Sequence, residues 1–167
     1  FVTVTSAIKI SLPLTRGGST MSLSYAGMFA SLLILGTPET VILGLVGAWT
    51  QCNLKMKARN PAHRTLFSMA CLALTVQGTG TVYRWVGAEQ AAGFIGMLQP
   101  LLPATVAYFV INTALVAAAV ALSSREALWK VWRDNFLWSA PGYFVGAVLA
   151  AVVAFVADQQ TYWWTAL

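Results

Sequence analysis

Charged side chains are scarce in this chain of 167 residues. Asp, Glu, Lys and Arg together make up 9% of the sequence, whereas 58% of the residues are hydrophobic. An ordinary soluble domain has roughly a quarter of charged residues, which it needs to cover a surface exposed to water. The deficit excludes a typical water-soluble domain. Stretches nearly free of charge, at 21–52 and 98–122, favour solvation by lipid instead.

Histidine and cysteine are also rare, and this limits the chemistry. The one histidine, His63, lies beside Arg64 in a basic segment and is interpreted as a solvated loop residue. Cys52 and Cys71 form no CxxC motif, so neither a disulfide framework nor metal-ligand spacing is present. No acid–base pair, nucleophile triad or phosphate-binding glycine loop can be assembled. We therefore predict no catalytic residues, no metal and no cofactor, and a chain that is not an enzyme.

The net charge of +5 does not indicate nucleic-acid binding, because the basic residues only punctuate apolar runs. They gather in two segments, 53–65 with four Lys and Arg residues and 123–135 with three. Cytoplasmic loops of membrane proteins collect Lys and Arg in this way. We predict that both segments are cytoplasmic, in a multi-pass protein of the bacterial inner membrane whose first partner is the lipid bilayer.

Apolar runs and helix breakers predict an all-α fold, a polytopic transmembrane helix bundle formed by a single membrane domain, 1–167. About five to six spanning or partly spanning helices and one interfacial amphipathic helix are expected. The predicted segments are the end of a helix at 1–12, transmembrane helices at 21–35, 39–52, 66–83, 98–122 and 136–157, and the interfacial helix at 124–135. We expect the domain to be truncated at both ends.

The predicted interfacial helix follows Ser123-Ser124-Arg125-Glu126, whose Ser-x-x-Glu spacing is typical of a capping box. Tryptophan and basic residues then share one short amphipathic stretch. The residues predicted to contact the membrane surface are Trp129, Lys130, Trp132 and Arg133. Two roles remain open for this helix: a lipid-surface anchor, or a lever that transmits motion to a cytoplasmic partner.

A ridge of small residues recurs every four positions in the last predicted helix. It comprises Gly142, Gly146, Ala150 and Ala154. Small residues let a second helix backbone approach closely, so the ridge predicts helix packing, either inside one bundle or at a dimer seam. Ala114 and Ala118, on the helix at 98–122, are a candidate partner surface.

Polar side chains within the apolar segments are candidates for ligand binding, because an unpaired polar group in hydrocarbon is costly and usually faces a cavity or a partner. The candidates are Gln51, Gln77, Gln99 and Asn112, with Glu39 and Arg84 near the predicted outer surface. Gln77 lies among threonines and glycines, and this arrangement resembles the mouth of an outward-facing pocket. The alternatives are hydrogen bonds between helices for Gln77 and Asn112, a helix start for Glu39 and snorkelling for Arg84.

Several short motifs resemble a known bacterial membrane module. They include LGTPET at 35–40, GAWTQC at 47–52, YFVINT at 108–113 and LWKVWR at 128–133. The chain is similar to the amino-terminal multi-helix sensory region that precedes cyclic-di-GMP signalling domains of the GGDEF or HD-GYP type. The resemblance implies a sensory or anchoring module. The chain has no GGDEF or HD-GYP motif, so synthase or phosphodiesterase activity would lie in a cytoplasmic domain outside it.

A fainter likeness, over 12–23, is to the substrate-binding subunits of energy-coupling-factor transporters. Three hypotheses therefore stay open. The first is the sensory or anchoring module, which would bind an unknown small ligand or form a homodimer. The second is a structural accessory subunit of a larger respiratory or photosynthetic membrane complex, which the seven tryptophans favour. The third is the substrate-binding subunit of a small-molecule transporter.

Overall fold

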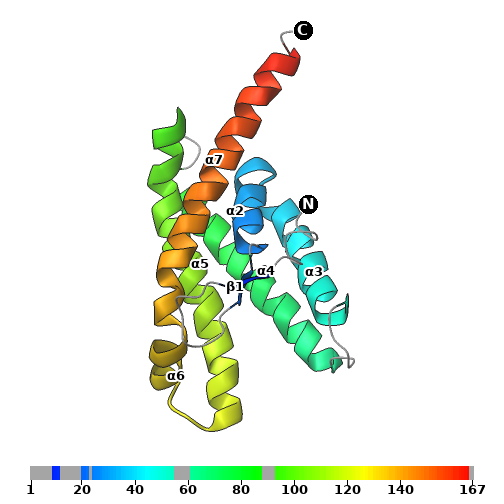
Figure 1. Cartoon of the computed structure of the whole chain (residues 1–167), viewed down its shortest axis with the longest axis vertical. Helices are drawn as coiled ribbons and strands as arrows, with labels where there is room; N and C mark the ends of the chain where they lie inside the picture. The colour runs from blue at the N-terminus through cyan, green and yellow to red at the C-terminus, as the bar shows by residue number, and fades with distance from the viewer. Residues whose placement is uncertain (1–8, 12–19, 23, 55–60, 88–92, 166–167) are drawn as a thin grey trace.

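The computed structural model describes residues 9–11, 20–22, 24–54, 61–87 and 93–165, and within these the chain is almost entirely helical (Figure 1). Two three-residue strands come first, followed by six α-helices and one 3-10 turn. They are β1 (Lys9–Ser11), β2 (Thr20–Ser22), α2 (Ser24–Ile34), α3 (Thr37–Leu54), α4 (Ala62–Trp85), α5 (Gly93–Ser124), α6 (Leu128–Asn135), η2 (Leu137–Ser139) and α7 (Ala140–Thr165).

Three described segments are long and apolar enough to cross a membrane: Ala62–Trp85, Ile95–Ser124 and Leu128–Ala157. The shortest has 24 residues, and at 1.5 Å per residue it extends about 36 Å, which exceeds the roughly 30 Å of a bilayer's hydrocarbon core. By length and composition the chain is therefore an α-helical membrane protein. Helix α2 has 11 residues, about 17 Å, and reaches only about halfway. The finer expectation of five to six spanning or partly spanning helices stays a prediction.

The structure corrects the sequence prediction at the start of the chain. A helix end is expected over 1–12, but Lys9–Ser11 form strand β1, which pairs antiparallel with β2 so that Ile10 lies opposite Met21. The rest of the predicted segment, 1–8 and 12, lies outside the described residues. The backbone groups of β1 are paired with a second strand instead of within a helix, and its residues pair with residues 9 to 13 positions away in the sequence.

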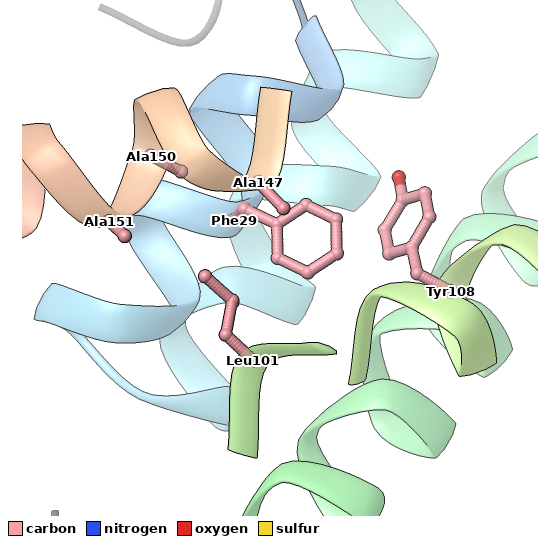
Figure 2. Close-up of a cluster of buried hydrophobic side chains, with 6 residues drawn as sticks. All are labelled: Phe29, Leu101, Tyr108, Ala147, Ala150 and Ala151. Atoms are coloured by element: carbon pink, nitrogen blue, oxygen red, sulfur yellow. The ribbon is translucent and has the colours of Figure 1, made fainter. Parts of the chain in front are cut away.

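Helix α2 lies at the centre of the bundle, beside α7 and in contact with α3 and α4 (Figure 1). Figure 2 shows the Phe29 ring between Ala147 of α7 and the Tyr108 ring of α5. The ring is 1% exposed, and Ala150 and Ala151 beside it are 1% and 0% exposed. The small side chains of α7 let α2 come close enough to bury this aromatic ring.

The ridge of small residues on α7 packs against α2, whereas the sequence offers Ala114 and Ala118 of α5 as its candidate partner. A Cβ atom on Gly146 would overlap the Tyr25 ring, and the Tyr25 hydroxyl donates a hydrogen bond to the carbonyl oxygen of Gly142. The partner is α2 because its large aromatic side chains fill the shallow surface that glycine and alanine leave.

Helices α3 and α4 form an antiparallel pair that also depends on small residues. A Cβ atom on Gly44 of α3 would lie 3.0 Å from Leu72 Cδ2 of α4, and one on Gly80 of α4 would overlap the Thr37 side chain of α3. The chain enters this pair through Gly36, whose φ of 93° is a left-handed conformation that glycine adopts without steric penalty. The turn between α2 and α3 therefore requires glycine.

Threonine hydroxyls in the core are satisfied within their own helices. Each of five buried threonines donates to the carbonyl oxygen four residues earlier, at 2.6–2.8 Å: Thr40, Thr75, Thr79, Thr105 and Thr113. No buried side-chain N or O atom of the described residues lacks a hydrogen-bond partner. This matters in lipid, where no water can satisfy an unpaired group.

Helix α6 begins four residues later than the predicted 124–135, and the capping-box interpretation is wrong. Ser123 and Ser124 belong to the last turn of α5, and their hydroxyls donate to carbonyl oxygens of that helix. Arg125 has a φ of 57°, and the amide of Glu126 donates to the carbonyl oxygen of Ala121, as in a Schellman motif. The left-handed residue ends α5, so no helix can start at the serines.

We predict that Gly146→Leu destabilises the bundle by about 1–3 kcal/mol, the range for overpacking a filled core. The new side chain would displace the Tyr25 ring and separate α2 from α7. The measurement is the free energy of unfolding in mixed micelles, titrated with a denaturing detergent. Val148→Leu, at an exposed position of the same helix, is the control and should have no effect. Equal stability of the two variants would contradict the α2–α7 packing.

We also predict that Arg125→Gly stabilises the protein by about 1 kcal/mol, because a non-glycine residue in the left-handed region costs about 1–2 kcal/mol. The same titration measures the gain. Arg133→Gly, inside α6, is the matched control and should lose about 1 kcal/mol through its lower helix propensity. A loss of stability in both variants would show that the end of α5 does not require this conformation.

Candidate functional site

A cluster of tyrosines lies where α2, α5 and α7 meet. The ring centroids of Tyr25 and Tyr143 are 5.0 Å apart, and those of Tyr108 and Tyr143 are 5.9 Å apart. Tyr108 is 4% exposed, and its ring also lies 5.0 Å from that of Phe29. These are the distances at which aromatic rings attract each other in tilted arrangements. One phenol from each of three helices is thus brought to one place.

Hydrogen bonds join the same helices. Asn112 Nδ2 of α5 donates to the Tyr143 hydroxyl of α7 over 3.1 Å, and the Tyr25 hydroxyl of α2 donates to the Gly142 carbonyl oxygen of α7. We call Tyr25, Tyr108, Asn112 and Tyr143 the tyrosine cluster. Interhelical bonds of this kind fix the rotation and depth of neighbouring membrane helices, because a shifted helix would leave a polar group unpaired.

The hydrogen bonding continues from the tyrosine cluster to α6. Thr113 follows Asn112 in α5, and Trp132 Nε1 of α6 donates to its hydroxyl oxygen over 2.9 Å. The Phe109 ring lies between, 6.0 Å from the Trp132 ring and 5.3 Å from the Tyr143 ring by centroids. Helix α6 is therefore attached to the interior of the bundle by a specific donor and a specific ring contact.

The chemistry of the tyrosine cluster is that of uncharged donors and acceptors. Its phenols and amide can bind a neutral polar group or exchange partners with one another. No charged side chain belongs to it, so the arrangement suits recognition and positioning better than proton transfer between acids and bases. Across the residues that the structure describes, no group of three or more His, Cys, Asp or Glu side chains is placed to hold a metal ion.

Of the six predicted ligand-binding residues, only Asn112 belongs to the tyrosine cluster. The other five have exposed side chains on α3, α4 and α5: Glu39, Gln51, Gln77, Arg84 and Gln99. The threonines around Gln77 divide between two faces, since Thr75 and Thr79 are fully buried in packing while Thr81 is exposed. The predicted residues therefore do not line one site.

The residues predicted to pack or to meet the membrane surface lie as follows. Along α7, Gly142 is half-buried while Gly146, Ala150 and Ala154 are buried. On α6, Trp129 is 65% exposed and stacks on Trp132, which is half-buried. Lys130 and Arg133 are exposed, in ion pairs of 4.0 Å with Glu126 and 3.6 Å with Asp134. Such exposed pairs stabilise a protein by at most about 1 kcal/mol.

The three tyrosines are not among the predicted site residues. Their signal in the sequence is a hydroxyl-bearing aromatic residue inside an apolar helix, which needs a hydrogen-bond partner once buried. Tyr108 and Tyr143 are both aromatic residues with a hydroxyl inside an apolar helix, and Tyr143 has Asn112 as its hydrogen-bond partner. Sequence alone could not pair Asn112 with Tyr143, because these two residues are 31 positions apart.

Comparison of the chain with protein-family models, with curated proteins and with solved structures finds no match. The resemblance to the sensory region of cyclic-di-GMP proteins therefore stays a prediction, and so does the likeness to transporter subunits.

We predict that Asn112 and Tyr143 are coupled by about 0.6 kcal/mol, the average for a side-chain hydrogen bond between membrane helices. The measurement is a double-mutant cycle of Asn112→Leu and Tyr143→Phe, with the free energy of unfolding determined in mixed micelles. Gln77→Leu is the control, because it removes an exposed side-chain amide from another helix. Its coupling energy with Tyr143→Phe should be zero. A coupling energy of zero for Asn112 and Tyr143 would contradict the bond between α5 and α7.

Proposed function

We propose that this chain is the membrane-embedded sensory or anchoring module of a bacterial signalling protein and has no catalytic activity of its own. The observation that supports this role is a set of three interhelical hydrogen bonds that joins α2, α5 and α7 to one another and the short amphipathic helix α6 to α5. An anchor alone would need no such attachment, since an amphipathic helix binds the interface through its apolar face.

Three hydrogen bonds connect four helices, one after another. Tyr25 joins α2 to α7, Asn112 joins α5 to α7, and Trp132 joins α6 to α5. A ligand or a change in the bilayer that shifts α2 against α7 would therefore alter the position of α5 and the support under α6. In this proposal helix α6 has two states. In one state Trp132 is hydrogen-bonded to Thr113 of α5, and in the other state this bond is broken and α6 leaves α5.

The proposed orientation places α6 in the cytoplasm. His63 at the start of α4 and Ser123 at the end of α5 line the same groove, so these two helix ends lie at the same end of the bundle. They belong in the sequence to the basic segments 53–65 and 123–135. The excess of Lys and Arg in these segments favours the cytoplasmic side of the inner membrane. A domain that makes or degrades cyclic-di-GMP would lie outside this chain.

A second candidate function, an accessory subunit of a larger membrane complex, is favoured by the outer face of α4. Gln77 and Thr81 are exposed there, between the exposed Leu74 and Trp85. A glutamine side chain facing hydrocarbon is unfavourable, and a helix from another subunit would give it a partner.

The sensory role is tested by a fluorescent label on α6. The variant carries Cys52→Ser, Cys71→Ala and Asp134→Cys, with an environment-sensitive dye on the new thiol. We expect the emission to shift when the protein is moved from short-chain to long-chain phosphatidylcholine vesicles, because long helices tilt in a thin bilayer and stand more upright in a thick one. Trp132→Phe, which lacks the N–H donor, should reduce the shift by more than half.

Trp129→Phe is the matched control for this experiment, because Trp129 is exposed and stacks on Trp132 without bonding to Thr113. It should leave the shift unchanged. An equal shift in the two variants would contradict coupling through Trp132. The intact mass of the natural polypeptide separates the two candidate functions: a mass far above 17.9 kDa favours the signalling protein, and fixed-ratio partners at about that mass favour the accessory subunit.

A further inference from the structure

A groove of about 810 Å³ opens between α4 and α5 at the end of the bundle that carries the basic segments. Its walls come from the first turns of α4, including His63, Arg64 and Phe67, and from the last turns of α5, including Val120 and Ser124. This volume lies in the range of sites that hold small organic molecules, roughly 300–1,000 Å³. The groove does not involve the tyrosine cluster.

The groove is amphipathic along its length. Phe67 and Val120 are 42% and 43% exposed and give it apolar walls toward the membrane interior. From Ser124 to Val116, both lining residues, it follows eight residues of α5, about 12 Å. One leaflet of a bilayer's hydrocarbon core is about 15 Å thick. The whole groove is therefore slightly shorter than one leaflet, and its apolar part on α5, from Val120 to Val116, extends about 6 Å.

The charge at the groove selects an anion. Arg64 is exposed on the first turn of α4, and none of the described residues that line the groove is acidic. Two ion pairs of the described residues join Lys130 to Glu126 and Arg133 to Asp134, and Arg64 takes part in neither. A guanidinium group binds phosphate through paired N–H donors. Its position at the open end of an apolar groove is where the phosphate of a membrane lipid would lie.

Ser123 and Ser124, at the open end of the groove, determine which lipid headgroup fits beside the phosphate. The hydroxyl of Ser123 donates to the Ala119 carbonyl oxygen over 2.8 Å, and that of Ser124 donates to the Val120 carbonyl oxygen over 2.9 Å. With their protons used in this way, the serine oxygens can only accept hydrogen bonds. They suit a headgroup that itself carries hydroxyl donors, and not a second phosphate or a quaternary amine.

We propose that the groove between α4 and α5 binds an anionic glycerophospholipid with a hydroxyl-bearing headgroup. The phosphate lies at Arg64, the headgroup hydroxyls at Ser123 and Ser124, and one acyl chain along Phe67 and Val120. The site does not rest on the signalling role, since an accessory subunit could hold the same lipid.

The test is native mass spectrometry of the full chain, released from micelles that contain phosphatidylglycerol or phosphatidylcholine with the same acyl chains. We expect the protein to retain phosphatidylglycerol preferentially. Arg64→Gln should weaken that retention about fivefold, since one basic residue near anionic lipid contributes about 1 kcal/mol. Arg125→Gln, at an exposed arginine outside the groove lining, is the matched control and should retain the lipid as the unaltered protein does.

A second variant tests the apolar part of the groove. Ala119→Phe would fill it and should abolish retention of phosphatidylglycerol, whereas Leu102→Phe, at an exposed position of the same helix, should not. Unchanged retention in both Arg64→Gln and Ala119→Phe would overturn the proposal. Displacement of the lipid by excess inorganic phosphate alone would also overturn it, because the groove would then be a site for a soluble anion.

Discussion

The contact between α2 and the small residues of α7 is the constraint on which the rest of the bundle depends. Lipid gives apolar helices no hydrophobic reason to associate, so association relies on close packing and hydrogen bonds. Tyr25 supplies both, because its ring lies on Gly146 and its hydroxyl is bonded to α7. Phe29 and Met28, on two faces of the same short helix, then join α7 and α5 on one side to α4 on the other.

Satisfying polar groups without water explains the remaining interior. The buried threonines use carbonyl oxygens of their own helices and so allow close packing at no loss of hydrogen bonds. Asn112 and Trp132 instead find partners on neighbouring helices, Asn112 at the Tyr143 hydroxyl and Trp132 at the hydroxyl oxygen of Thr113. These bonds attach a short amphipathic helix at the surface to the centre of the bundle, and the proposed sensory role rests on that attachment.

One end of the molecule gathers several features that are separate in the sequence. Helix α6 packs on the last turns of α5, and the first turn of α4 lies at the same end of the bundle, across the groove from α5 (Figure 1). The left-handed Arg125 makes this possible, because it ends α5 and turns the chain so that Val131 and Trp132 pack back on Ala117 and Ala121. A groove with apolar walls and an exposed arginine lies between α4 and α5 at that end.

The sequence by itself determined the all-helical membrane class and the approximate positions of the long helices. The length of an apolar run is a local property of the sequence, and a run long enough to cross the hydrocarbon core forms a helix there. Tertiary structure alone decided which helices pack against each other. It also decided that Asn112 donates a hydrogen bond to Tyr143 while Gln77 is exposed, and that Lys9–Ser11 form a strand paired with β2. In a chain apolar on all sides, no helix face is marked as interior by its composition. The choice is made by steric fit and by the geometry of a few hydrogen bonds between residues distant in sequence.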